Sequence, residues 1–140
     1  MPSKLVNILL IEDNPGDIVL VKDALKEYGI EHTLCVATDG EEALEFIEHA
    51  GEPGYAARPD LLLLDLNLPK RDGPEVLREL RRNPRYTETP VIIVSSADRP
   101  HDRTKVAAFN IKHYFRKPIN YDEYLLLGQV IRDVMTQVRA

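Results

Sequence analysis

The run Leu61-Leu62-Leu63-Leu64-Asp65-Leu66 is the most apolar stretch of the chain, and it decides the fold. Intrinsic propensity alone would allow a helix here. The run is short, however, and helix-breaking prolines stand on both sides of it, Pro59 before and Pro69 after. A short apolar run bounded in this way is typical of a strand that is buried on both faces. We therefore predict a central strand that ends at a carboxylate, Asp65.

Strand-like and helix-like stretches alternate on both sides of this run. Short apolar or β-branched segments predict four more strands, at residues 5–11, 32–37, 90–94 and 111–115. Apolar residues at helical spacing predict five helices, at residues 18–28, 39–47, 72–82, 100–109 and 120–138. Three of these helices open on a capping pattern, in which an acidic or amide residue precedes a glutamate by three positions: Asp39, Asp72 and Asn120. Residues 49–60 are rich in glycine and proline and predict a loop.

The alternation determines the fold class. Five strands that alternate with five helices are typical of an α/β protein, in which helices cover both faces of a parallel sheet. Right-handed crossovers restrict its topology strongly. We predict a doubly wound, five-stranded parallel sheet with the strand order 2-1-3-4-5. No repeat interrupts the pattern, so residues 1–140 are predicted to form a single domain with no effector domain.

Length and composition exclude several classes of protein. A chain of 140 residues, of which 44% are hydrophobic, can bury a core without disulfides or a structural metal. The single cysteine, Cys35, rules out a disulfide framework and a cysteine-based zinc site, and it fits a reducing, cytoplasmic compartment. The net charge of -5 disfavours nucleic acid as a partner. No run is long enough to span a membrane, and residues 1–5 lack the apolar stretch of a signal peptide.

Polar side chains gather where the predicted strands end. They are Glu12 and Asp13 after the first strand, Asp65 at the end of the third, Ser95 at the end of the fourth and Lys117 after the fifth. Because parallel strands share one carboxyl edge and the first and third strands are neighbours, Asp13 and Asp65 are expected to face each other. Close carboxylates repel unless a cation lies between them, and Mg²⁺ prefers oxygen ligands. Since a carboxylate can also act as a nucleophile, the cluster predicts a phosphoacceptor site centred on Asp65.

These residues resemble the motifs of the response regulator receiver domain, and the resemblance covers residues 6–138. Each motif is weak alone, but all four in order at fitting separations are highly specific. The segments Glu12-Asp13-Asn14-Pro15-Gly16-Asp17 and Asp65-Leu66-Asn67-Leu68-Pro69-Lys70-Arg71-Asp72-Gly73 are similar to those of single-domain regulators that serve cyanobacterial and bacterial phytochrome histidine kinases. The resemblance implies a flavodoxin-like fold and a role in a two-component phosphorelay.

The resemblance implies a role for each acidic residue. Asp65 matches the phosphorylated aspartate of the family. Asp13 matches the main metal ligand, and its neighbour Glu12 would act on the metal directly or through water. The backbone carbonyl of Asn67 would be a further ligand. Mg²⁺ is the expected cofactor, with Mn²⁺ or Ca²⁺ as substitutes.

The remaining matches concern the switch. Ser95 matches the hydroxyl that moves toward the phosphoryl group, although threonine is commoner there and serine lacks the methyl group that stiffens χ1. Lys117 would pair with the phosphoryl oxygens. Tyr114, three residues earlier, matches the aromatic that changes rotamer. The family often has a cis peptide after the lysine, so a cis bond is expected before Pro118. Asn110 stands where glycine is frequent, and asparagine tolerates positive φ.

The resemblance also predicts partners. A sensor histidine kinase, here of phytochrome type, would donate the phosphoryl group, and the output would be a contact with a protein target. The chain would then be a signalling domain rather than an enzyme, apart from catalysing its own phosphorylation and dephosphorylation. Tyr121, Tyr124 and residues 125–127 give the last helix more apolar surface than one face needs. Many receiver domains form dimers through the fourth helix, the fifth strand and the fifth helix. Together with this apolar surface, the resemblance predicts a homodimer through the same elements.

Several of these residues also have an ordinary structural interpretation. Asp13 alone could cap the first helix, Lys117 alone could lie on the surface, and Tyr114 could be a packing residue of an edge strand. A run of arginines in one helix predicts a solvated face: Arg78, Arg81, Arg82 and Arg85.

Two other functions fit an α/β fold of this kind. A phosphatase with an aspartyl intermediate needs a second acid two residues after the nucleophile, to protonate the leaving group. This chain has Asn67 there, which cannot donate that proton, so a phosphatase is disfavoured. A flavodoxin-like binding module needs a phosphate-cradling loop after the first strand. Here Glu12 and Asp13 follow that strand and would repel phosphate, which disfavours such a module.

Overall fold

The predicted parallel sheet is confirmed in a computed structural model, which describes residues 5–96 and 100–139. Its five strands pair in the order β2-β1-β3-β4-β5, and every pairing is parallel. The strands are β1 (Val6–Ile11), β2 (His32–Ala37), β3 (Leu61–Leu64), β4 (Val91–Ser95) and β5 (His113–Arg116). Residues 1–4, which entered the signal-peptide prediction, lie outside the described residues.

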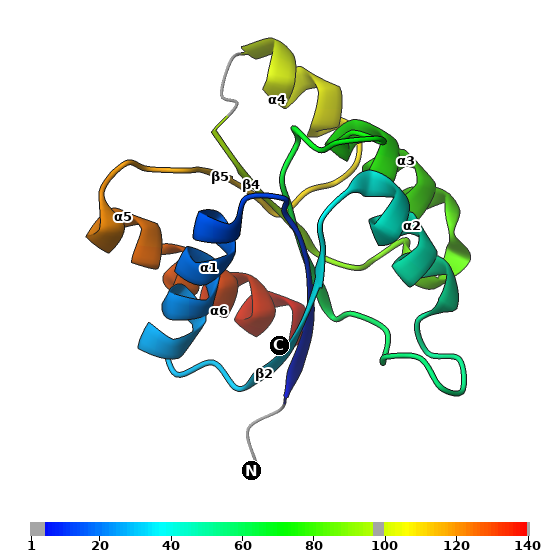
Figure 1. Ribbon diagram of the computed structural model, residues 1–140, viewed down its shortest axis with the longest axis horizontal. Helices are drawn as coiled ribbons and strands as arrows, with labels where there is room; N and C mark the ends of the chain where they lie inside the picture. Colours follow the sequence, from blue (N-terminus) through cyan, green and yellow to red (C-terminus); the bar gives the residue numbers. More distant parts are fainter. Residues whose placement is uncertain (1–4, 97–99, 140) are drawn as a thin grey trace.

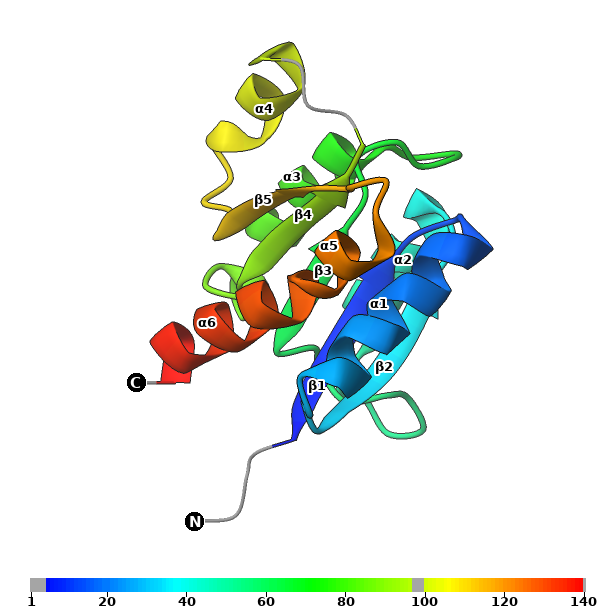
Figure 2. The ribbon, with the colours of Figure 1, turned by 90° about the vertical axis from the view of Figure 1, so that its left-hand side faces the viewer.

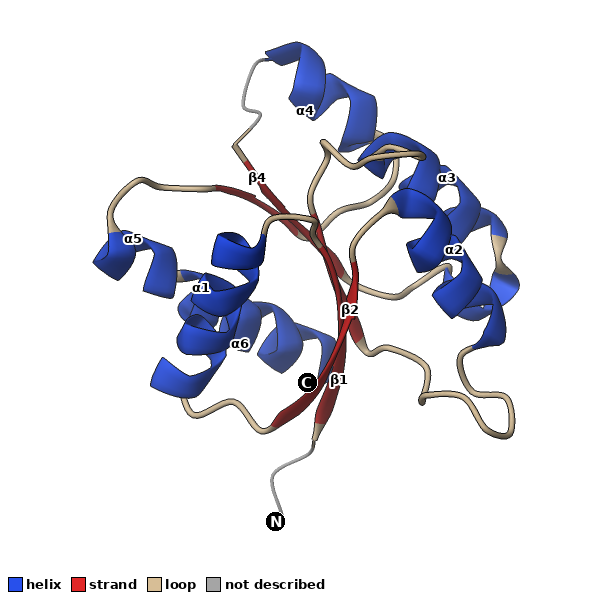
Figure 3. Ribbon diagram, in the orientation of Figure 1, coloured by secondary structure: helices blue, strands red, loops and turns tan. Residues whose placement is uncertain are grey.

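Helices cover both faces of the sheet. They are α1 (Pro15–Glu27), α2 (Gly40–His49), α3 (Gly73–Arg82), α4 (Pro100–Ala107), α5 (Tyr121–Leu125) and α6 (Leu127–Arg139), with a short 3-10 helix, η1, at Pro84–Tyr86. α1 packs against α5 and α6 on one face, and α3 packs against α2 and α4 on the other (Figures 1 and 2). The sheet is seen nearly edge-on between these two layers in Figure 3. In the described part of the chain, none of the helices is long and apolar enough to cross a membrane.

The predicted strand at residues 61–66 lies at the centre of the sheet, and its side chains divide the core in two. Successive side chains of a strand point to opposite faces. Leu61 and Leu63 accordingly join the apolar cluster beneath α1, α5 and α6, whereas Leu62 and Leu64 join the cluster beneath α2 and α3. All four leucines are fully buried. The regular strand ends at Leu64, which places the Asp65 side chain at the carboxyl edge of the sheet.

The predicted final helix is two helices rather than one. α5 ends at Leu125 and α6 begins at Leu127. At the junction the Leu126 N–H donates to the Glu123 carbonyl, three residues back, instead of continuing the α-helical pattern. The apolar spacing continues across this break because Tyr124, Leu127 and Ile131 all face the core. Periodicity alone therefore did not reveal it.

The predicted solvated arginine face is wrong for Arg81. Its guanidinium is half-buried and donates hydrogen bonds to the carbonyls of Tyr86 (2.8 Å), Thr89 (2.8 Å) and Phe109 (2.9 Å). These carbonyls lie in the segments that lead into β4 and β5. Arg81 therefore fastens α3 to the amino edge of the sheet, where loop carbonyls have no strand partners.

Candidate functional site

The carboxyl edge of the sheet brings the predicted site residues together. β1 lies between β2 and β3, so the residues that follow β1 and β3 are neighbours in space. One carboxylate oxygen from each of Glu12, Asp13 and Asp65 lies within 4.8 Å of the others. Glu12 and Asp65 are buried, whereas Asp13 is exposed. The acidic cluster (Glu12, Asp13 and Asp65) is therefore open to solvent on the Asp13 side.

Asp65 is held by donors on both carboxylate oxygens. Its Oδ1 accepts a hydrogen bond from the Ser95 hydroxyl (3.0 Å) and another from the Asn67 backbone N–H (3.1 Å). Its Oδ2 accepts one from Lys117 Nζ (3.0 Å). The Asp65 backbone is fixed as well, because its N–H donates to the Ile11 carbonyl at the end of β1 (3.1 Å). The carboxylate is thus oriented by three neighbouring segments of the chain.

Lys117 is the positive charge of the site. Its Nζ lies 2.7 Å from Glu12 Oε1, 3.0 Å from Asp17 Oδ2 and 3.0 Å from Asp65 Oδ2. Burial opposes the charge, but the hydrogen bonds to these carboxylates outweigh burial and raise the pKa of Lys117. The side chain is not on the surface, so the ordinary interpretation of this lysine is wrong. One ammonium group serves three carboxylates, with Asp13 as a further acid nearby.

Asp17 was missed as a site residue in the sequence. It lies in the first turn of α1 and belongs to the quoted segment that begins at Glu12. Nothing in its spacing shows that it reaches a lysine 100 positions away. An acidic residue in the first turn of a helix is usually explained by the helix dipole alone.

Asp13 does not cap α1. The N-cap is Asn14, whose Oδ1 accepts a hydrogen bond from the Asp17 N–H (3.1 Å). The capping interpretation of Asp13 is therefore wrong, and its carboxylate remains part of the acidic cluster.

Glu12 shows that the cluster carries more negative charge than Lys117 can balance. The residue is 1% exposed, and its pKa is raised to about 7 by burial, with repulsion from Asp65 adding to the effect and Lys117 opposing it. A buried carboxylate with a raised pKa is stabilised by a nearby cation. Oxygen donors, surplus negative charge and one solvent-exposed side match the needs of a hard divalent ion such as Mg²⁺. The acidic cluster can therefore bind a metal.

Tyr114 lies beside the site rather than in it. It is half-buried in the middle of β5 and packs against the core on the α2 and α3 face. The guanidinium carbon of Arg103, from α4, lies 4.3 Å from the centroid of the Tyr114 ring, within the range of a cation–π interaction. Tyr114 therefore connects β5 to α4.

Two backbone predictions have different outcomes. The described peptide bonds include no cis bond, so the Lys117–Pro118 bond is trans and the expectation of a cis bond is wrong. The two isomers of an X–Pro bond differ by only about 0.5–1 kcal/mol, so sequence does not decide between them. Asn110, by contrast, has a φ of +54°, as its replacement of glycine allows.

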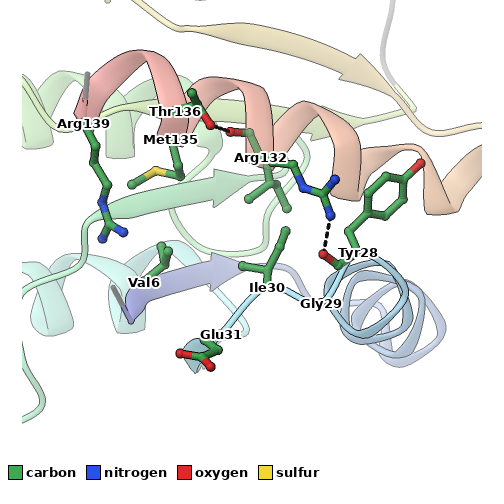
Figure 4. A pocket seen from close by; sticks show the side chains of 10 residues that line it. Val6, Tyr28, Gly29, Ile30, Glu31, Arg132, Met135, Thr136 and Arg139 are labelled. Carbon is green, nitrogen blue, oxygen red and sulfur yellow. Dashed lines mark hydrogen bonds between the residues drawn. The ribbon is translucent and has the colours of Figure 1, made fainter. Parts of the chain in front are cut away.

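A hollow of about 610 Å³ lies away from the acidic cluster, at the amino edge of the sheet. It lies between the end of α1 and the last turns of α6, with Val6, Ile30 and Met135 among its lining residues (Figure 4). Arg132 closes one side, where it donates a hydrogen bond to the Tyr28 carbonyl (2.5 Å). Glu12, Asp13 and Asp65 do not line this hollow, so the hollow is separate from the predicted phosphoacceptor site.

Comparison with known proteins agrees with this geometry. Response regulator Rcp1 of Synechocystis is 37% identical over 124 residues, which span 89% of this chain and 84% of Rcp1. The crystal structure of the phosphorylated cyanobacterial phytochrome response regulator RcpA superposes with a TM-score of 0.84 at 35% identity, covering 93% of each chain. The Mn²⁺-bound form of Rcp1 gives a TM-score of 0.80 at 36% identity, over 90% of this chain and 91% of that one.

A more distant structure holds magnesium. The receiver domain of the Pseudomonas aeruginosa sensor histidine kinase PA1611, with a magnesium ion coordinated in its active-site cleft, gives a TM-score of 0.70 at 26% identity. It covers 91% of this chain and 97% of that one.

The parallel sheet of this order, with acids and a lysine at its carboxyl edge, is the arrangement of a receiver domain. The response regulator receiver domain model matches residues 8–127, and the chain belongs to that family. Members are signalling domains of two-component systems, which take a phosphoryl group from a sensor histidine kinase onto an aspartate with Mg²⁺ present.

A Glu12→Gln variant tests the electrostatics of the site. Without divalent cations it is expected to be more stable than the wild type by about 1 kcal/mol, or a few degrees in melting temperature, because one buried charge is removed. The raised pKa fixes the pH dependence. The folded wild type retains a proton that the unfolded chain releases, so its stability falls as pH rises from about 4.5 to about 7. The difference in stability between the wild type and the Glu12→Gln variant therefore increases as pH rises through this window, and it is constant above it.

The measurement is thermal melting in a chelator at several pH values, with a Mg²⁺ titration alongside. Mg²⁺ is expected to stabilise the Glu12→Gln variant less than the wild type. Glu45, exposed on α2, supplies the matched control, since Glu45→Gln should change neither property. A Glu12→Gln protein that melts below the wild type at pH 8 in chelator would contradict this account.

Proposed function

We propose that Asp65 is the phosphoacceptor of this receiver domain and that it accepts its phosphoryl group from a sensor histidine kinase. One observation carries the proposal: Asp65 is a buried carboxylate that Ser95 and Lys117 both contact, beside two further acids. A carboxylate ending an apolar strand is unfavourable unless it is paired. Its position at the end of β3 therefore supports a chemical role rather than a role in core packing.

The transfer is a displacement at phosphorus. An oxygen of the Asp65 carboxylate attacks the phosphorus of a phosphohistidine, the phosphorus–nitrogen bond breaks, and the imidazole nitrogen retains the electron pair. Mg²⁺, when bound, supplies positive charge that offsets the charges of the carboxylates and the phosphoryl oxygens. Glu12, Asp13 and Asp65 would hold it together with the backbone carbonyl of Asn67. Lys117 contributes a second positive charge, which its Nζ can present to a phosphoryl oxygen on Asp65.

The switch begins with the donors that now contact Asp65. The hydroxyl of Ser95, at the end of β4, turns from Asp65 Oδ1 toward the phosphoryl group. Tyr114 pairs with Ile93 of β4 and stacks under Arg103 of α4, so a change at the end of β4 reaches α4 through it. Phosphorylation then shifts a two-state equilibrium at this surface, and a protein target senses the change.

The phytochrome link is part of the proposal. Its support is the likeness to Rcp1 and to RcpA, which is described as a cyanobacterial phytochrome response regulator. We expect a phytochrome-type histidine kinase as the phosphodonor. The single cysteine and the kinase partner agree with a location in the cytoplasm.

The proposal is tested by intact mass. Incubation with a small phosphodonor such as acetyl phosphate and Mg²⁺ should add one phosphoryl group to the protein. A parallel sample in chelator should gain none, because the carboxylates would then repel the phosphodonor. A protein that gains no phosphoryl group in Mg²⁺, from the small donor or from a phosphorylated kinase, would refute the proposed function.

We also propose a homodimer through α4, β5 and α5. Its support is an exposed apolar group around α5, in which Ile119 is fully exposed and Tyr121 and Leu126 are each 52% exposed. Such a group favours association when it is contiguous. Light scattering at micromolar concentration should show a dimer, and Leu126→Asp should reduce it to monomer. Val19→Asp, at an apolar residue of α1 with 54% exposure, is the matched control and should leave the dimer intact. A wild-type protein that is monomeric with and without phosphorylation would reject the dimer.

A further inference from the structure

Tyr124 is a buried tyrosine whose hydroxyl has no partner. The residue is 1% exposed, and among the described residues its hydroxyl is the one buried side-chain polar atom without a hydrogen bond. The other fully buried tyrosine behaves differently, because the Tyr86 hydroxyl donates to the Ile47 carbonyl (3.0 Å). Buried hydroxyls are almost always paired, so an unpaired one needs a physical explanation.

The surroundings of Tyr124 are acidic. It lies on α5, which packs against α1, the helix that carries Asp17. Its ring meets Phe115 of β5 edge-on, with centroids 5.9 Å apart. Burial raises the pKa of Tyr124, and the nearby carboxylates of Asp17 and Glu12 raise it further. The hydroxyl therefore keeps its proton. It lies close enough to the Asp17 carboxylate to interact with it, but it does not reach the geometry of a hydrogen bond.

Asp17 is the acceptor whose pairing can change. In this state its Oδ2 accepts a hydrogen bond from Lys117 Nζ (3.0 Å), and its side chain is 18% exposed. Lys117 also contacts Glu12 and Asp65. If Lys117 turns toward a phosphoryl group on Asp65, Asp17 loses a charged donor in a largely buried place. A carboxylate there needs another donor.

We infer that the Tyr124 hydroxyl is the second donor for Asp17, unpaired while Lys117 holds Asp17 and bonded to it once Lys117 turns to the phosphoryl group. Tyr124 is thus a positioning residue that favours the phosphorylated state. The inference rests on the proposed roles of Asp65 and Lys117. The unpaired hydroxyl destabilises the unphosphorylated state, and its bond to a charged acceptor stabilises the phosphorylated one.

The Tyr124→Phe variant separates this role from packing. Removing an unpaired buried hydroxyl should raise the melting temperature of the unphosphorylated protein. The same change should weaken binding of beryllofluoride, a stable mimic of the phosphoryl group, by about tenfold in the presence of Mg²⁺, because a bond to a charged acceptor is lost. Calorimetric titration measures the affinity. A purely structural role would leave the affinity unchanged.

Two further variants serve as controls. Tyr86→Phe removes a paired buried hydroxyl far from the site, so it should lower the melting temperature and leave beryllofluoride affinity unchanged. Asp17→Ala removes the acceptor. Adding Tyr124→Phe to Asp17→Ala should then cause no further loss of affinity, since the two changes remove the same bond.

The outcomes are distinct. An unchanged affinity in Tyr124→Phe, or a loss that persists in the Asp17→Ala background, overturns the inference while the wild type still gains its phosphoryl group. A Tyr124→Phe protein that melts below the wild type overturns it as well, because the hydroxyl would then be paired in the unphosphorylated state. A wild type that neither gains a phosphoryl group nor binds beryllofluoride overturns the proposed function, and the inference with it.

Discussion

An Asp65→Asn variant is expected to gain no phosphoryl group from a small phosphodonor or from a kinase, while folding as the wild type does. Asparagine has nearly the shape of aspartate, and its carbonyl oxygen can still accept from the Ser95 hydroxyl and the Asn67 N–H. Its amide lacks the nucleophilic oxygen that attacks phosphorus. The loss should therefore be complete, although Lys117 keeps its contacts with Glu12 and Asp17.

Intact mass and circular dichroism check the two parts of this expectation. Asp133→Asn is the matched control. Asp133 is an exposed aspartate on α6 whose carboxylate accepts from Gln129, and its variant should be phosphorylated normally. A phosphoryl group that still appears in Asp65→Asn would show that another residue is the acceptor, and it would contradict the assignment of Asp65.

Loss of Lys117 is expected to have the largest effect on stability. In Lys117→Ala, the buried Glu12 and Asp65 carboxylates lose their shared ammonium group, whose Nζ lies 2.7 and 3.0 Å from them. Removing one partner of a buried ion pair costs about 3 kcal/mol or more, because uncompensated charge is left behind. In a chelator the melting temperature should fall by about 10 °C. Mg²⁺ should recover part of the loss, since it supplies positive charge to the same carboxylates.

Lys22→Ala controls for the loss of a lysine as such. Lys22 is exposed on α1 and should alter the melting temperature by about 1 °C at most. Thermal melting with and without Mg²⁺ measures both variants. If Lys117→Ala melts like the wild type in chelator, Lys117 does not hold the acidic cluster together.

The sequence predicted the fold and the placement of the acidic cluster because both depend on strand ends. A parallel sheet puts every strand's carboxyl end at one edge, so knowing where the runs before Glu12 and Asp65 stop is enough to bring these residues together. The strand order then makes β1 and β3 neighbours. Packing details inside the helices do not affect this conclusion.

What the sequence left out depends on side-chain reach. Asp17 and Arg81 both lie at helix positions with ordinary solvent explanations, yet each contacts groups far away in the chain. Their partners are fixed by how helices pack on the sheet, which periodicity does not specify. The same holds for Tyr124, whose apolar ring fits the helical pattern and conceals the unpaired hydroxyl.

The junction at Leu126 has a mechanical consequence. α6 is anchored along its length, and its Gly128 approaches the Tyr28 ring so closely that a side chain there would collide with it. α5 is joined to that anchor through one tight turn, and it carries both Tyr124 and the exposed Tyr121. Because α5 packs against α1, which carries Asp17, a rearrangement around Asp17 would act on this short segment first. A partner bound on α5 would sense the chemistry at the sheet edge through this segment, because Tyr124 reaches the core and Tyr121 reaches the surface.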